Sequence, residues 1–416
     1  MKSWIESAND PECDFPLNNL PMGVFSLDHG EPRCCTAIGK FVLDLTGLED
    51  ARIIQGSDGE MFQTSALNCF MAQGEKAWAS LRSQLQTLLS DGSSISSEQK
   101  IIKNFLHPAQ TVEMHLPFKV SEYTDFYACK NHAFNVGTML RGKENALPPN
   151  YFHIPIGYNG RASTVVVGGT KIVRPKGQIK PPKKEHPIYA PSSRLDMELE
   201  IGAVVGLPSE MGHPISLEEA EAMIFGYVLL NDWSARDIQA FEYQPLGPFQ
   251  AKAFATSIGP WVITKAALEP FRVSTPNRVK PLLAYLEDTG PMLYNINLAI
   301  EIQTASLHSA TIISKTNYKE MYYSAAQQLT HHASSGCAMN TGDLLGSGTI
   351  SGSQSSSYGS FMELSWGGEK PIELPSGETR SFLHDGDKIT LKGHCQGNGY
   401  RIGFGECSGE ILPALK

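Results

Sequence analysis

Hydrophobic and polar residues alternate without a break at residues 195–201, where the sequence reads LDMELEI. Because successive side chains of a β-strand point to opposite faces, this segment would place four apolar side chains on one face and three carboxylates on the other. Like charges on one face repel, so the acidic face needs either full solvation, as on an edge strand, or a cation. The pattern predicts a strand with an acidic face and leaves both explanations open.

The N-terminal part of the chain has a different pattern. Short apolar runs broken by turn residues, from residue 15 to about residue 60, are typical of a small β-barrel or meander. Large apolar residues at helical spacing then predict a helix over residues 65–89, which Asp91 and Gly92 would end. A new apolar and aromatic pattern starts after Pro117, so we expect a domain boundary near residue 118.

Chemistry-bearing residues first gather just after this boundary. Residues 123–129 predict a strand on which Asp125 and Tyr127 share a face, followed by His132 in a short polar break. Residues 151–160 contain Pro and Gly among Tyr, Phe and Ile, which predicts a loop. A long aromatic loop in a compact domain is usually functional, because its composition argues against disorder.

A second polar face is predicted after residue 216. Ser216 and Glu219 form a capping box, and residues 220–230 continue as an apolar helix or a helix-to-strand run. The following residues predict another helix with Asp232 as its N-cap. Such a helix would align four polar side chains at spacings of four, three and four: Asp232, Arg236, Gln239 and Tyr243. A capped surface helix with an Asp–Arg pair would have the same pattern, so this face alone does not identify a site.

Two later segments complete the candidate chemistry. Residues 346–352 read GSGTISG but lack the Lys-Ser/Thr ending of a phosphate loop, so they predict a tight loop that presents Thr349. Residues 361–366 alternate between bulky and polar residues and predict a strand that carries Glu363.

Composition and charge narrow the class of protein. The 416 residues are 41% hydrophobic and 19% charged, which is typical of a globular protein with two or three domains. Acidic residues outnumber basic ones by 43 to 34, which disfavours nucleic acid and anionic membranes as partners. We expect a soluble cytoplasmic protein, because the start of the sequence has no signal-like apolar core and no apolar run could span a bilayer. Eight scattered cysteines without a C-x-x-C pair indicate reduced thiols.

Taken together, these segments resemble the fumarylacetoacetase family over nearly the whole chain. The matching motifs are DFY at 125–127, NHA at 131–133, MLRG at 139–142, PIGYNGR at 155–161, LDMELE at 195–200 and NDWSARD at 231–237. The last two motifs occur across a broader superfamily of diketone hydrolases, decarboxylases and hydratases. The segments around His132 and Arg141 indicate the narrower family.

The resemblance implies a fold and an assembly. It implies a β-rich α+β fold, with an SH3-like N-terminal β-barrel in residues 1–118 and a fumarylacetoacetase-type mixed β-roll in residues 119–416. The second domain would be catalytic and metal-binding, and two chains would form a homodimer.

The resemblance also implies a metal site. The ion would be held by Asp125, Glu198, Glu200 and Asp232, with Lys252 and Thr256 as further ligands where the ion is magnesium. The chemistry agrees, because carboxylates without Cys or His make a hard oxygen site suited to Ca²⁺ or Mg²⁺. Asp196 is not among the family's ligands, and we expect it to serve a turn or to support a neighbouring side chain.

The implied reaction is hydrolysis of the carbon–carbon bond of 4-fumarylacetoacetate to fumarate and acetoacetate, the last step of tyrosine and phenylalanine catabolism. His132 would be the general base, oriented by Glu363. Negative charge on oxygen would be stabilised by Arg236, Gln239 and Lys252. The dianionic substrate would be bound by Arg141, Gln239 and the hydroxyl groups of Tyr127, Tyr158, Tyr243 and Thr349.

Two other functions fit the same residues less well. One is a related superfamily enzyme, either an acylpyruvate hydrolase or an oxaloacetate decarboxylase, against which the His132–Glu363 pair and the full-length N-terminal part argue. The other is a non-catalytic calcium-binding protein, in which the acidic residues would be purely structural and His132 would be dispensable.

Overall fold

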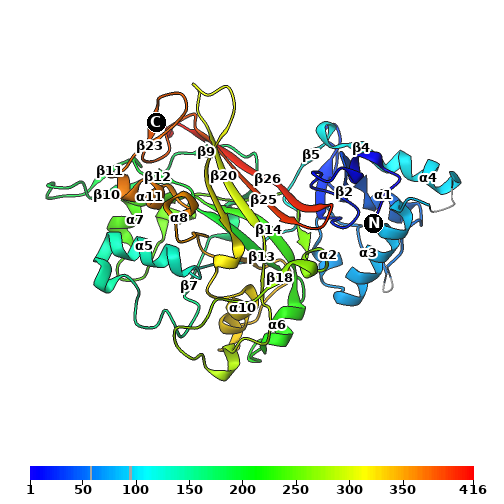
Figure 1. Ribbon diagram of the computed structural model, residues 1–416, viewed down its shortest axis with the longest axis horizontal. Coiled ribbons are helices and arrows are strands. Elements are labelled where there is room, and N and C mark those ends of the chain that lie inside the picture. Colours follow the sequence, from blue (N-terminus) through cyan, green and yellow to red (C-terminus); the bar gives the residue numbers. More distant parts are fainter. Residues whose placement is uncertain (57–58, 93–95) are drawn as a thin grey trace.

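The N-terminal lobe is built around one small sheet. The computed structural model describes residues 1–56, 59–92 and 96–416, and Figure 1 shows this lobe at one end of the molecule. Its five antiparallel strands lie in the order β4-β3-β2-β1-β5. They are β1 (Met22–Ser26), β2 (Arg33–Ile38), β3 (Phe41–Asp44), β4 (Leu106–Pro108) and β5 (Glu113–Met114).

The predicted helix over residues 65–89 is wrong as a single element. It is divided into α2 (Asn68–Met71) and α3 (Glu75–Leu89). Gly74 separates them with a φ of 82°, a left-handed value that glycine adopts without steric cost. The apolar face of α3, which includes Leu81 and Leu85, is buried in the core of the lobe.

An eight-stranded sheet forms the centre of the larger lobe. Seven strands lie in the order β7-β6-β22-β13-β14-β16-β8, and β17 also pairs with β14. They are β6 (Tyr123–Phe126), β7 (Gly157–Asn159), β8 (Val165–Val167), β13 (Leu199–Val205), β14 (Ile224–Asp232), β16 (Thr256–Ile258), β17 (Ile263–Thr264) and β22 (Leu344–Gly346). β22 pairs in parallel with β6, and β16 with β8, so the sheet is mixed.

A second sheet packs against this one. Its order is β21-β20-β25-β26-β9, and β14 contacts both β25 and β26. The strands are β9 (Ile172–Val173), β20 (Asn297–Gln303), β21 (Thr311–Asn317), β25 (Lys388–Gln396) and β26 (Arg401–Leu412). The long strands cross the middle of Figure 1.

Both faces of β14 are buried, which explains its unbroken apolar sequence. Leu229 belongs to the core of the larger lobe, whereas Val228 and Leu230 belong to the core that this lobe shares with the N-terminal one. The lobes are also joined by two backbone hydrogen bonds between Met22 and Val262, of 2.9 and 2.8 Å. A strand covered on both faces needs no polar alternation. The helix-to-strand alternative for residues 220–230 is therefore correct, since α6 (Leu217–Met223) ends where β14 begins.

The predicted acidic strand at residues 195–201 is broken. β12 (Leu195–Asp196) pairs with β15 (Ser234–Ala235), and β13 starts only at Leu199. The break has a local cause, because the Asp196 carboxylate accepts the N–H of Met197 at 2.7 Å and so competes with strand pairing. The solvated-edge explanation is wrong: Asp196, Glu198 and Glu200 are at most 4% exposed.

Three other sequence-based predictions about local structure are wrong. His132 lies in the first turn of α5 (Lys130–Arg141), not in a polar break. Asp232 ends β14 and does not cap a helix, because α7 (Arg236–Glu242) starts four residues later. Residues 361–364 form the short helix α11 (Phe361–Leu364) instead of a strand, since the Ser360 side chain accepts the N–H of Glu363 as an N-cap.

Two further helices are short. α8 (Gln250–Ala253) follows α7, and α10 (Ala325–Ala333) packs against α6, low in the view of Figure 1. Among the helices in the described ranges, none combines the length and the apolar character that crossing a bilayer requires.

Candidate active site

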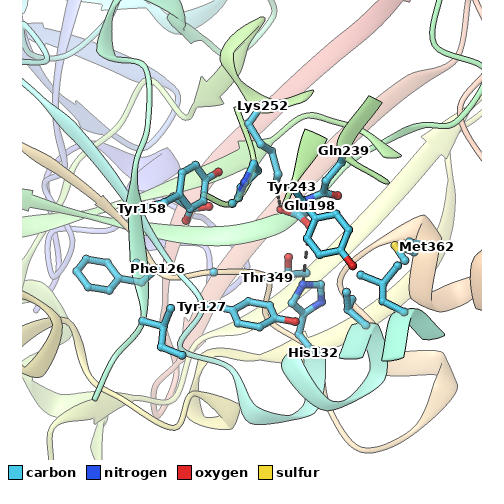
Figure 2. A pocket seen from close by; sticks show the side chains of 18 of the residues that line it. Phe126, Tyr127, His132, Tyr158, Glu198, Gln239, Tyr243, Lys252, Thr349 and Met362 are labelled. Atoms are coloured by element: carbon cyan, nitrogen blue, oxygen red, sulfur yellow. Dashed lines mark hydrogen bonds and ion pairs between the residues drawn. The ribbon is translucent and has the colours of Figure 1, made fainter. Parts of the chain in front are cut away.

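A cavity of about 310 Å³ lies at the ends of the central strands, between α5 and α7. Figure 2 shows the side chains of His132, Glu198, Lys252 and Gln239 around this space, with Phe126 and Met362 at its sides. It is lined by most of the residues that the sequence predicts for a site: Asp125, Tyr127, His132, Arg141, Tyr158, Glu198, Glu200, Arg236, Gln239, Tyr243, Lys252 and Thr349. Three predicted residues, Asp232, Thr256 and Glu363, are buried behind this lining.

Four buried carboxylates form one cluster in the wall of the cavity. Asp125, Glu198, Glu200 and Asp232 each offer an oxygen atom, and these atoms all lie within 4.8 Å of one another. Strand register explains how residues so far apart in sequence meet. Asp125 pairs with Gly346 across β6 and β22, Gly346 pairs with Gly202 of β13, and the Asp232 N–H donates to the Glu198 carbonyl at 3.2 Å.

The electrostatics of this cluster favour binding of a cation. Burial, together with the neighbouring carboxylates, raises the pKa of Asp125 and of Glu200 well above the ordinary range. Glu198 differs, because Arg236, Lys252 and His132 outweigh the effect of burial and lower its pKa. Two buried oxygen atoms, Asp125 Oδ1 and Glu200 Oε1, have no hydrogen-bond partner in the part of the chain that the structure describes.

These observations fit a hard divalent cation. The cluster supplies only carboxylate oxygens, which Ca²⁺ and Mg²⁺ prefer, and its unpartnered oxygen atoms have the desolvation cost that a cation would offset. The carboxylates of Asp125 and Glu200 can lie this close to β22 only because residue 346 is glycine. A Cβ atom there would lie 2.6 Å from Asp125 Oδ1 and 3.0 Å from Glu200 Oε2.

Lys252 and Thr256 both contact the cluster. The Lys252 ammonium donates to carboxylate oxygens of Glu198 and Asp232. Burial opposes its charge, but these carboxylates outweigh burial and raise the pKa of Lys252. A protonated ammonium has no lone pair for a metal, so the ligand role of Lys252 stays a prediction. The Thr256 and Tyr158 hydroxyls each donate to Asp232, both at 3.2 Å.

His132 and Glu363 form a buried pair beside the cluster. His132 Nδ1 lies 2.7 Å from Glu363 Oε2, and His132 Nε2 lies 3.9 Å from Glu198 Oε1. Burial opposes ionisation of Glu363, but its hydrogen-bonded neighbours, first His132, lower the pKa of the carboxyl. An ionised carboxylate only accepts hydrogen bonds, so Nδ1 carries the proton. In the neutral ring with its proton on Nδ1, Nε2 is the acceptor, and His132 lines the cavity wall.

Sequence reasoning missed the residues that hold Glu363 in place. Oε2 also accepts hydrogen bonds from the Ser351 hydroxyl at 2.8 Å and the Ser360 hydroxyl at 3.0 Å, while Oε1 accepts one from Asn135 Nδ2 at 2.9 Å. Asn135 lies one helical turn after His132 in α5. This i,i+3 spacing could have indicated Asn135, but only if residues 130–141 had been predicted as a helix.

Arg236 is held by a buried ionic network. It donates from Nε to Asp196 at 2.8 Å, from Nη2 to Glu198 at 2.5 Å and from Nη1 to Gln239 at 3.0 Å. Burial opposes the charge on Arg236, but Glu198 and Asp196 outweigh it and raise the pKa. Asp196 also accepts the backbone N–H groups of Phe361 and Met362, at 2.7 and 3.0 Å. The expected supporting role of Asp196 therefore has a specific form: it links Arg236 to the helix that carries Glu363.

The predicted substrate-binding residues border the cavity and differ in whether their polar groups already have hydrogen-bond partners. Arg141, the last residue of α5, donates from Nε to the Asn145 carbonyl at 3.1 Å and from Nη2 to the Ala146 carbonyl at 2.7 Å. The Tyr127 hydroxyl donates to the Ala133 carbonyl at 3.3 Å. The Thr349 hydroxyl is buried and has no partner within the described residues, as expected for a group that bonds to a ligand.

Comparisons with known proteins place this site in a family. The family model described as fumarylacetoacetate (FAA) hydrolase, C-terminal, matches residues 122–411, and the model described as fumarylacetoacetase, N-terminal, matches residues 18–117. Fumarylacetoacetase from Rattus norvegicus is 48% identical over 417 residues, which are 99% of each chain. The chain belongs to the fumarylacetoacetase family. Fumarylacetoacetase from Arabidopsis thaliana is 45% identical over 419 residues, covering 100% of this chain and 99% of that protein.

Solved structures share the family's fold at much lower sequence identity. The fumarylacetoacetate hydrolase from Exiguobacterium antarcticum superposes with a TM-score of 0.54 at 15% identity, covering 95% of this chain and 99% of that chain. The maleylpyruvate hydrolase from Sphingobium has a TM-score of 0.50 at 14% identity, covering 95% and 100%. The predicted family fold, a mixed α/β arrangement with curled sheets, is therefore confirmed. The SH3-like form of the N-terminal sheet stays a prediction.

Proposed function

We propose that this protein hydrolyses the carbon–carbon bond of 4-fumarylacetoacetate to fumarate and acetoacetate, the last step of tyrosine and phenylalanine catabolism. One observation carries the proposal: the His132–Glu363 pair and the acidic cluster face one cavity in a chain that is 48% identical to a fumarylacetoacetase over its full length.

His132 would act as the general base in this reaction. Its Nε2 would take a proton from water, and the water oxygen would form a bond to the ketone carbon of the fumaryl group, which becomes a carboxyl carbon of fumarate. The bond from that carbon to the acetoacetate carbon then breaks, and the electron pair leaves on the acetoacetate carbon as an enolate that takes up a proton. Glu363 would fix the Nδ1–H tautomer and stabilise the imidazolium that forms, because it accepts from Nδ1 at 2.7 Å.

The residues that would hold the metal ion are Asp125, Glu198, Glu200 and Asp232, with Thr256 and Lys252 beside them. A bound Ca²⁺ or Mg²⁺ would supply Lewis-acid stabilisation of negative charge on the diketone oxygens. Lys252, Arg236 and Gln239 would donate hydrogen bonds to the oxygen anion that forms when water adds. Glu198 and Asp232 already hold Lys252 and Arg236 in place, and Arg236 donates to the Gln239 side-chain oxygen, so little reorganisation would be needed.

The two carboxylates of the substrate would be bound nearer the cavity mouth. Arg141 Nη1 has no protein partner within the described residues, so it can bind a carboxylate while Nε and Nη2 keep their carbonyl partners. Tyr243 and Thr349 would donate from their hydroxyl groups. Tyr127 and Tyr158 would donate to the substrate in place of their acceptors in the free protein, the Ala133 carbonyl and Asp232. Val136, Leu140 and Met362 supply an apolar wall for the carbon chain.

A direct assay tests the proposal. Purified protein with Mg²⁺ or Ca²⁺ should abolish the ultraviolet absorbance of the conjugated diketone and release one acetoacetate per molecule consumed. Turnover of an acylpyruvate, or release of carbon dioxide from oxaloacetate, with no consumption of fumarylacetoacetate would refute it. The same three substrates therefore separate this function from the related superfamily activities.

A single substitution separates an enzyme from a metal-binding protein. His132→Ala should leave the protein folded and able to bind Ca²⁺ while hydrolysis falls by at least about 100-fold, the smallest effect typical of losing a general base. His213→Ala is the matched control, because the His213 side chain is exposed and pairs, within the described residues, only with Glu210. Full activity in His132→Ala would show that the base is another group.

We also propose the finer features that the resemblance implies: a cytoplasmic homodimer, an SH3-like barrel in residues 1–118 and a catalytic domain in residues 119–416. Light scattering of the purified chain tests the dimer, and fractionation of cells tests the compartment. Expression of the two segments alone tests whether residue 118 separates units that fold independently.

A further inference from the structure

A second cavity, of about 230 Å³, lies between the two lobes, away from the acidic cluster. On one side it is lined by α3 of the N-terminal lobe, seen in Figure 1. On the other it is lined by the start of β14 and by the short helix α9 (Lys265–Leu268). No residue of the candidate active site lines this cavity.

Three aromatic side chains lie in the cavity wall. Phe225 packs edge-on against Phe70, with ring centroids 5.9 Å apart, and against Trp78, with centroids 5.1 Å apart. Edge-to-face contacts of this kind leave ring surfaces that can bind another ring. An engineered apolar cavity of about 150 Å³ is large enough for benzene. A cavity of about 230 Å³ therefore has room for one ring and a short side arm.

One charge in this wall is not neutralised. The Arg82 guanidinium donates to the backbone carbonyls of Asn18 and Asn19, but no carboxylate of the described residues lies within 4.0 Å of it. Burial lowers the pKa of Arg82 to about 10, and no neighbouring charge opposes this effect. The other charged groups of the wall are paired, Lys265 with Glu75 at 3.0 Å and Glu269 with Arg272 at 3.1 Å.

An unpaired hydroxyl group adds a second polar feature. Thr264 Oγ1 is buried, lines the same cavity and has no hydrogen-bond partner within the described part of the chain. Buried polar atoms are nearly always paired, so an unpaired hydroxyl and an unneutralised guanidinium in the wall of one cavity indicate a ligand with oxygen atoms.

We propose that this inter-lobe cavity binds a small monocarboxylate with a single aromatic ring, whose carboxylate pairs with Arg82 and whose ring lies against Phe70, Trp78 and Phe225. The ligand contacts both lobes and stabilises their association. This site is independent of the proposed hydrolysis, because it shares no residue with that machinery. The competing explanation is that Arg82 only holds residues 18 and 19 against α3.

The test uses the full-length protein and 3-phenylpropanoate as the probe. Labelling tryptophan with ¹⁵N gives five indole signals, one of them from Trp78, which a Trp78→Phe variant assigns. Addition of the probe should shift the Trp78 signal. Arg82→Met should weaken binding at least tenfold, whereas Arg141→Met, which alters the active-site mouth, should leave the affinity at this signal unchanged.

Two further measurements keep the test decisive if Arg82→Met does not fold. The uncharged analogue 4-phenylbutan-2-one should bind wild-type protein at least tenfold more weakly than the carboxylate. Thr264→Val should weaken binding of 3-phenylpropanoate by a larger factor than it weakens binding of the ketone. An unshifted Trp78 signal, or equal affinities for carboxylate and ketone, would overturn the proposal.

Discussion

Replacing Glu363 by glutamine removes a charge without removing volume. The carboxylate accepts four hydrogen bonds, from His132, Ser351 and Ser360 at Oε2 and from Asn135 at Oε1. Glutamine offers one acceptor oxygen and one donor NH₂ group. If the oxygen takes the Oε2 position, His132 keeps its tautomer but loses the charge that stabilises its imidazolium form. If the NH₂ group takes that position, the ring must carry its proton on Nε2 and cannot act as a base.

Both orientations lower the rate of the chemical step. Replacing the carboxylate of a serine-protease triad by its amide lowers kcat by about 10⁴-fold. We expect Glu363→Gln to lower kcat by about 10² to 10⁴-fold, equivalent to about 3–5.5 kcal/mol of transition-state stabilisation, with little change in KM. Steady-state kinetics on the conjugated diketone measures both constants.

Two controls separate this effect from damage to the site. Asn135→Ala removes the donor to Oε1 but leaves the His132 tautomer fixed, so kcat should fall less than about tenfold, as expected from one lost hydrogen bond. Calorimetric titration should give the same Ca²⁺ affinity for Glu363→Gln and wild-type protein. Activity of Glu363→Gln within threefold of wild type, or loss of Ca²⁺ binding together with activity, would refute the reasoning.

Three further outcomes are expected. Asp196→Asn should lower the free energy of unfolding, measured in urea, by about 3–5 kcal/mol, as for other broken buried ion pairs. It should also lower kcat. Unchanged stability would exclude the role of Asp196 in linking Arg236 to α11. Gly346→Ala should weaken Ca²⁺ binding at least tenfold in calorimetry, because the added methyl group would lie 2.6 Å from Asp125 Oδ1, whereas the control Gly259→Ala, with neighbours no closer than 3.6 Å, should bind normally. Chelation should lower the melting temperature, and the loss should grow as the pH is raised above the ordinary carboxyl range. The reason is that Asp125 and Glu200 have raised pKa values in the folded chain, so the stability of metal-free protein falls as pH rises above the ordinary carboxyl range; a pH-independent loss would contradict this.

The chemical identity of the site could be predicted from the sequence better than its local structure. The resemblance motifs named His132, Glu198 and Glu200, and the structure brings them to one cavity. The secondary structure that carries Asp232 to the cluster could not be predicted. Its spacing to Arg236 matches a helix, and only the sheet partners of β14 show that the strand continues to Asp232. Periodicity carries no information about such long-range pairing.

The same limit explains the error at Glu363. Residues 361–366 alternate as a strand would, but Asp196, far away in sequence, accepts the N–H groups of Phe361 and Met362. These bonds satisfy the first turn of a helix, and Ser360 caps it. A carboxylate from a distant segment thus decides the local structure, and no window of sequence around Glu363 contains it.

The burial of β14 on both faces limits which amino-acid substitutions the strand can accept. In a sheet with one solvated face, every second position of a strand accepts polar residues. Along residues 227–230 of β14, the odd and even positions face two different cores, so neither set should accept polar residues. A library of all single substitutions should show uniform intolerance over this strand, with no period of two. The N-terminal lobe packs against a strand that ends at the cluster of four carboxylates, and this contact limits how far the sequence of the lobe can diverge.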